Sequence, residues 1–151
     1  MIKEAYVSFE VARLLKEKGF NEECNRVYEG PNLKYTTLSI SPLMCLGELG
    51  GFHPKQLYVS NNELGDIVYT APTQQMAMAW LRKKNISIEP SALNAHSWAY
   101  TIYKLLNNKV KELYNDGGFD SYEDAVEAAL KYCLENLFDL INKSYGTRKQ
   151  T

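Results

Sequence analysis

Three helix starts of one kind divide this chain of 151 residues, and they constrain its fold more than any other feature. At Ser8–Ala12, Thr73–Ala77 and Ser121–Ala125 a hydroxyl residue is followed, four places on, by an alanine that opens an apolar helical stripe. A hydroxyl oxygen in this position caps backbone N–H groups of the first helical turn. The alanine lies where the helix must approach its support closely. We therefore predict a helix after each start, the last running to about Asn142.

The segments between these starts are rich in β-branched and aromatic residues, and residues typical of turns interrupt them. The predicted hairpins cover residues 24–40, 57–71 and 98–114, with turns at 30–32, 61–65 and 107–108. In the last hairpin, Asn107 and Asn108 tolerate the positive φ of a type I′ turn. Residues 91–97 are expected to be a polar link, and Asp116-Gly117-Gly118 is expected to end the return strand.

The predicted element order is α-ββ-ββ-α-ββ-α, and no parallel crossover is needed to connect the strands. This order is typical of an α+β fold, which we expect to be one antiparallel sheet built from hairpins with three helices packed on it. A chain of this length fits one domain. We assign that domain to residues 1–142 and expect residues 143–151 to fray.

The charge balance argues against one large class of partners. With 17 basic and 18 acidic side chains the net charge is −1, whereas affinity for duplex nucleic acid needs a basic field to neutralise phosphates. No apolar run has the length of a membrane span or of a signal peptide. The cysteines Cys24, Cys45 and Cys133 include no Cys-x-x-Cys pair, which favours reduced thiols. We expect a cytoplasmic protein that needs no cofactor, and we expect no metal site, because neither histidine has ligand spacing.

Residues 41–56 follow no period and contain three glycines and two prolines, yet they are apolar for a loop. Such a segment either packs under the domain or forms an exposed contact surface. A cluster of three cations at the end of the second helix has a structural explanation, because cations there complement the helix dipole. We nevertheless predict that the two together form a binding surface. Its residues would be Leu43, Met44, Cys45, Leu46, Leu49, Phe52 and His53 with Arg82, Lys83 and Lys84.

Two other chemistries compete with this surface. Cys45 and His53 could act as nucleophile and base of a small hydrolase or transferase, with the loop glycines turning N–H groups toward an oxyanion. A structural thiol and a surface histidine are the alternative. Trp98 and Tyr100 share a strand face that could stack the bases of single-stranded nucleic acid. A face covered by helices is the alternative for these two rings.

Two strings have a counterpart in a known group of proteins. They are TAPTQQMAMAWLR at Thr70–Arg82 and SYEDAVEAALKYCLENL at Ser121–Leu137. The chain resembles small proteins of phages and integrated elements of gut Bacteroidales, in which an APTQQMAMxWLR helix precedes a tyrosine-rich hairpin and a YEEAVEAAIKYCLENL helix. The resemblance covers about residues 66–142. It implies a fold and a phage-associated origin, and it transfers no catalytic residue.

From these observations the expected function is non-enzymatic. We expect a phage or prophage accessory protein that acts by stoichiometric binding of a host protein or a small signalling ligand, as would suit a counter-defence role. That last step is an analogy with other phage proteins rather than a consequence of any residue.

Overall fold

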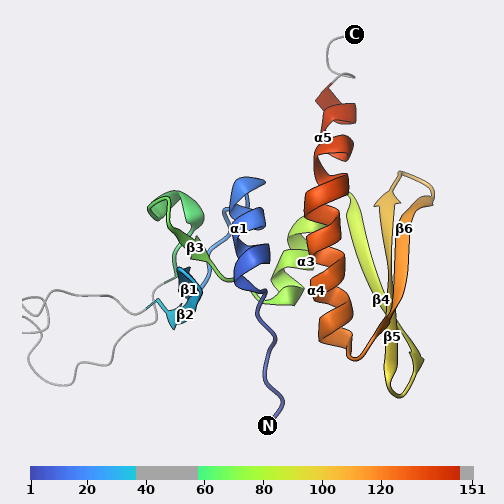
Figure 1. Ribbon diagram of the computed structural model, residues 1–151. Coiled ribbons are helices and arrows are strands. Elements are labelled where there is room, and N and C mark those ends of the chain that lie inside the picture. Colours follow the sequence, from blue (N-terminus) through green and yellow to red (C-terminus); the bar gives the residue numbers. More distant parts are fainter. Residues whose placement is uncertain (37–57, 147–151) are drawn as a thin grey trace, which may run out of the picture.

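The computed structural model describes residues 1–36 and 58–146, with side chains to residue 143. In these residues, helices pack on two three-stranded antiparallel sheets, so the α+β class is confirmed. The strands form two separate sheets, however, where we expected one, and the helices lie between them (Figure 1). The elements are α1 (Phe9–Glu17), β1 (Arg26–Glu29), β2 (Asn32–Tyr35), the 3₁₀-helix η1 (Asn61–Glu63), β3 (Val68–Thr70), α3 (Gln74–Lys83), β4 (Ile86–Asn94), β5 (Ser97–Leu105), β6 (Val110–Phe119), α4 (Tyr122–Tyr132), the π-helix η2 (Cys133–Leu137) and α5 (Phe138–Gly146).

All three predicted helix starts are confirmed. The hydroxyl oxygens of Ser8, Thr73 and Ser121 each accept the backbone N–H three residues on, at 3.2, 3.1 and 3.0 Å. The alanines four places after the caps are completely buried. A larger side chain at these positions would push the helices away from their neighbours, which explains why alanine recurs there.

Thr73→Ala, which removes the hydroxyl, is expected to lower the free energy of unfolding by about 1 kcal/mol, because the Met76 N–H would lose its partner at a buried helix end. Thr73→Ser keeps the capping oxygen and provides the matched control. Urea unfolding of both variants measures the effect. Equal losses in the two variants would show that the methyl group, rather than the cap, matters at this position.

The smaller sheet has the order β2-β1-β3 and packs against α1. The hairpin predicted over residues 24–40 is confirmed for β1 and β2, with Gly30 at φ 57° in the turn, and residues 37–40 lie outside the described residues. The hairpin predicted over residues 57–71 is wrong, because β3 pairs with β1, and Val59 makes an isolated bridge with Cys24.

The side chain of Asn61 explains why residues 57–71 do not form a hairpin. Its amide donates to the Phe20 carbonyl at 2.8 Å and accepts the Thr70 N–H at 2.9 Å, in a site that is 4% exposed. The residue that we expected in an exposed turn is therefore an internal connector. It holds η1 against the end of the first helical unit, and β3 continues from there to the edge of β1.

The larger sheet has the order β4-β5-β6, and all its pairs are antiparallel. The predicted hairpin of β5 and β6 is confirmed, but Asn107 and Asn108 do not have positive φ, so the turn is not type I′. The expected polar link belongs largely to β4. β6 continues through Gly117, because a Cβ there would lie 3.3 Å from that of Ala99 and glycine permits this close approach of the strands.

The last predicted helix is confirmed and continues past Asn142 to Gly146; the remainder of the predicted tail lies outside the described residues. Its middle is the π-helix η2, where the Phe138 N–H bonds to the Cys133 carbonyl. α4 packs on the larger sheet and on α1, so it joins the two halves of the fold. No helix of the described residues has the length and apolarity required to cross a membrane.

Candidate functional site

The structure places only part of the predicted binding surface. Its loop members, Leu43, Met44, Cys45, Leu46, Leu49, Phe52 and His53, lie outside the described residues, and so does the Cys45–His53 pair. Arg82, Lys83 and Lys84 are exposed at the end of α3. Lys83 forms an ion pair with Glu22 at 3.4 Å, and the Lys84 ammonium lies 5.6 Å from the centre of the Trp80 ring.

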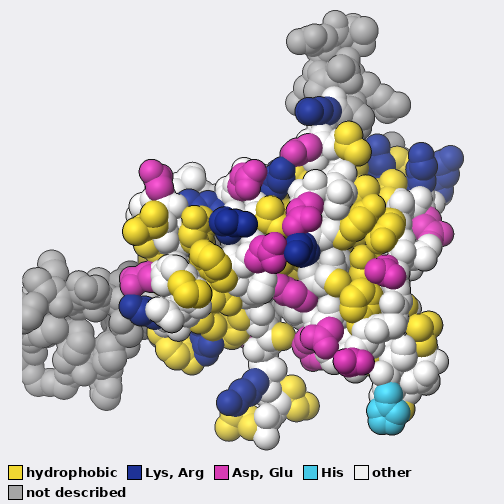
Figure 2. Space-filling view, viewed as in Figure 1, with side chains coloured by type: hydrophobic (Ala, Val, Ile, Leu, Met, Phe, Trp, Pro, Cys, Tyr) yellow, Lys and Arg dark blue, Asp and Glu magenta, His cyan; other side chains and the backbone are white. Residues whose placement is uncertain are grey.

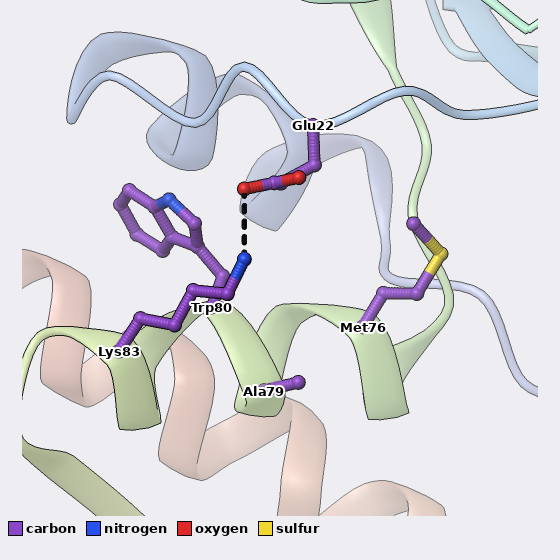
Figure 3. Close-up of a pocket in the computed structure, with 5 residues that line it drawn as sticks. All are labelled: Glu22, Met76, Ala79, Trp80 and Lys83. Atoms are coloured by element: carbon purple, nitrogen blue, oxygen red, sulfur yellow. Dashed lines mark hydrogen bonds and ion pairs between the residues drawn. The ribbon is translucent and has the colours of Figure 1, made fainter.

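A small pocket of about 170 Å³ adjoins this basic turn (Figure 3). It is lined by Glu22, Met76, Ala79, Trp80 and Lys83, and the Lys83–Glu22 ion pair spans it. The Trp80 ring is part of the hydrophobic core, with 6% of the residue exposed. A ligand in this pocket would therefore contact little of the Trp80 ring, because that ring packs into the core.

The strand face of Trp98 and Tyr100 is covered by α4. Tyr100 is 2% exposed, and the Trp98 ring makes an edge contact with Tyr122 at the start of α4, with 5.5 Å between ring centres. These two rings therefore do not form an open platform on which the bases of a single strand could stack.

A second hollow lies where the larger sheet extends beyond α4, and we call it the β6–α4 groove. Figure 2 shows a band of hydrophobic side chains between α4 and the sheet, with acidic side chains around it. The groove has a volume of about 260 Å³. Its lining residues are Tyr100, Tyr114, Asp116, Phe119, Ala128, Lys131, Tyr132 and Glu135.

Four aromatic rings from the sheet and the helix form the floor and wall of this groove. The rings of Tyr114, from β6, and Tyr132, the last residue of α4, stack with centres 3.7 Å apart and planes 8° apart. Tyr100 from β5 lies beneath them, 6.2 Å from Tyr114 and 5.6 Å from Phe119. Tyr114 and Tyr132 each cover one ring face of the other, and both keep part of their surface in contact with solvent at the open hollow.

The charges at the groove are predominantly acidic. Asp116 lies on the β6 side and Glu135 on the η2 side. Of the described residues, Lys131 is the only cation that lines the groove, and its ammonium lies 3.2 Å from Glu10 and 4.0 Å from Glu135. Among the described residues that line the groove, two carboxylates therefore stand beside one ammonium. Burial, and then the charge of Asp116, raise the pKa of Tyr100 above its usual range.

The wall formed by β6 is an edge of the sheet. β5 is its neighbour on one side, and no other described strand lies on its free side. Two irregularities of register, opposite Ile102/Tyr103 and Trp98/Ala99, bracket the regular stretch Tyr114–Gly117. Bulges of this kind limit edge-to-edge pairing. They leave a short regular edge at Tyr114–Gly117, and two residues of this stretch, Tyr114 and Asp116, line the groove.

The opposite wall contains the π-helix. Glu135 lies within η2, directly after the last turn of α4 that carries Lys131 and Tyr132. Single π-turns inside α-helices are uncommon and occur frequently at functional sites, because the extra residue changes which side chains share a face. The groove therefore combines a stacked tyrosine pair, a short sheet edge and a π-turn in one place.

We did not predict this site from the sequence. Tyr132 lies within the last predicted helix and Tyr114 at the end of the last predicted hairpin, and both residues are partly buried. The excess of tyrosine, 11 residues against 5 phenylalanines, was the available signal. It suits half-buried positions in general, and only the docking of α4 on the sheet shows which tyrosines meet.

No group of three or more His, Cys, Asp or Glu side chains among the described residues is placed to hold a metal ion. The described cysteines, Cys24 and Cys133, are both buried, and burial raises the pKa of their thiols to about 11 and about 12. Comparisons with protein-family models, with curated proteins and with solved structures found no match for this chain.

Proposed function

We propose that this chain is a phage or prophage accessory protein of the host cytoplasm that acts by stoichiometric binding of a host protein. The resemblance of Thr70–Arg82 and Ser121–Leu137 to phage-encoded proteins supports the origin. The observation that carries the binding proposal is the stacked pair of Tyr114 and Tyr132 in a groove beside a free sheet edge. An extended segment of the partner would pair with that edge and place a side chain in the groove.

The size of the groove favours a protein segment over a small signalling ligand. Pockets that enclose drug-sized molecules and cofactors usually measure about 300–1,000 Å³, whereas this groove measures about 260 Å³ and is open. Its acidic rim also disfavours nucleotides, because their phosphates would approach Asp116 and Glu135. One side chain of an extended peptide fits these dimensions and leaves the peptide backbone free to pair with β6.

Filling the groove is expected to abolish this binding. Ala128 lines the groove from α4, so Ala128→Trp would occupy it. The matched control is Ala79→Trp, which places the same side chain in the Trp80 pocket from α3. Peptides selected from a random displayed library against the wild-type protein should bind the Ala79→Trp variant and lose at least about tenfold in affinity for Ala128→Trp.

Hydrogen exchange provides the second measurement for the same peptides. Bound peptide should slow exchange of amides in Tyr114–Gly117, because an added strand protects the edge it pairs with. If no peptide is enriched, or if Ala128→Trp binds the selected peptides as well as the wild type does, the proposed function is wrong. Loss of binding in Ala79→Trp alone would move the site to the Trp80 pocket and the basic turn.

A further inference from the structure

The β6–α4 groove has features that select one class of side chain. Aromatic faces attract cations through the ring quadrupole, and the attraction grows when water is excluded. Here the rings of Tyr114, Tyr132 and Phe119 line a hollow above the buried Tyr100. Carboxylates stand on both of its sides, and the ammonium of Lys131, the one cation among the described lining residues, is already paired with Glu10 and Glu135.

We propose that the β6–α4 groove takes the cationic side chain of a lysine or arginine carried by an extended segment of the partner protein. This inference rests on the proposed function and specifies the chemistry of the residue that is bound. The cation would lie against the tyrosine pair, between the carboxylates of Asp116 and Glu135. The rest of the segment would pair with the β6 edge.

The geometry of strand addition brings these two parts together. An added strand would lie about 4.8 Å from β6 and point alternate side chains to the face that carries α4. Tyr114 and Asp116 are two residues apart on β6, and both line the groove, so both point to that face. A residue opposite Asp116 would have its Cβ about 4.5–5.5 Å away from that of Asp116. Its long side chain would then extend along the rings toward Glu135.

The free edge is short, and this limits the segment that can bind. The regular stretch between the two irregularities is Tyr114–Gly117. Recognition would therefore depend on one central basic residue and its immediate neighbours. Pairing over so few residues gives little affinity by itself, so the side chain in the groove must contribute much of the specificity.

The test compares two peptides that differ only in the charge of the central residue: acetyl-Thr-Val-Lys-Val-Thr-amide and the same peptide with norleucine in place of lysine. Binding is followed by NMR through the ring signals of Tyr114 and Tyr132 in the wild-type protein. We expect the lysine peptide to bind about tenfold more tightly than the norleucine peptide. Equal affinities would overturn the inference.

Two double variants locate the charge that is responsible. Asp116→Asn with Glu135→Gln should bring the lysine peptide down to the affinity of the norleucine peptide. The control, Asp66→Asn with Glu89→Gln, changes net charge equally at exposed positions that do not line the groove and should keep the difference. Equal effects of the two double variants would show that only the overall charge matters, and would overturn the groove assignment.

The results separate this inference from the proposed function. If the norleucine peptide binds as well as the lysine peptide and Ala128→Trp abolishes both, the groove binds a segment and the inference about the cation is wrong. If neither peptide binds and the library yields none, both fail. Spermidine is the third probe. If it binds as tightly as the lysine peptide, and does so without slowing hydrogen exchange of the β6 amides, the groove is a site for free amines. The proposal of a partner segment paired with β6 is then wrong.

Discussion

Trp80→Ala is expected to lower the free energy of unfolding by about 3–5 kcal/mol, which is a large share of the stability of a single domain. The Trp80 ring stacks on Phe138 with 5.3 Å between centres and a 14° angle between planes. It also receives the edge of Phe20 at 5.4 Å. Phe20 follows α1, Trp80 belongs to α3 and Phe138 begins α5, so one ring joins three segments that are distant in the sequence.

Urea unfolding followed by far-ultraviolet circular dichroism measures this loss without relying on the fluorescence of the residue that is removed. Trp98→Ala is the matched control, because Trp98 is half-buried at the outer end of the larger sheet. We expect it to cost less than half as much as Trp80→Ala. A smaller loss for Trp80→Ala than for Trp98→Ala would contradict the position of Trp80 at the centre of the packing.

The local signals in the sequence predicted most of the secondary structure correctly. Helix caps, strand-forming segments and turn residues depend on neighbours within a few residues, and they located the three helix starts and the hairpins of β1–β2 and β5–β6. The prediction failed where a polar residue bonds over a long distance. Asn61 has the composition of a turn residue, yet its side chain joins Phe20 to Thr70 inside the fold.

The division into two sheets and the location of the groove also depend on long-range packing. β3 pairs with β1 rather than with the segment that precedes β3 in the chain. α4 packs on β4 and β5 and leaves one side of β6 open. Tyr132 lies within the last predicted helix, but no pattern in the sequence places its ring on that of Tyr114. The three cations of the predicted basic turn are exposed at the end of α3, while the loop predicted to join them lies outside the described residues.

Alkaline pH is expected to destabilise the protein through Cys133. Burial raises the pKa of this thiol from its ordinary value of 9.0 to about 12. Above pH 9 the thiol of the unfolded chain loses its proton, whereas the folded chain keeps it until about pH 12, so proton release favours unfolding. The contribution is complete below pH 9 and is lost as the pH rises toward 12, by about 4 kcal/mol in all. Burial of Cys24, whose pKa is about 11, acts in the same direction.

The comparison of Cys133→Ala with the wild type isolates this effect. Loss of the sulfur at a fully buried site should cost about 1–2 kcal/mol at pH 8. Between pH 8 and pH 11, however, the free energy of unfolding should fall by about 2–3 kcal/mol less in the variant than in the wild type. Lysines and tyrosines titrate in both proteins, so their contributions cancel in this difference. Parallel pH dependences would contradict this prediction, because they would mean that the Cys133 thiol ionises as readily in the folded chain as in the unfolded one.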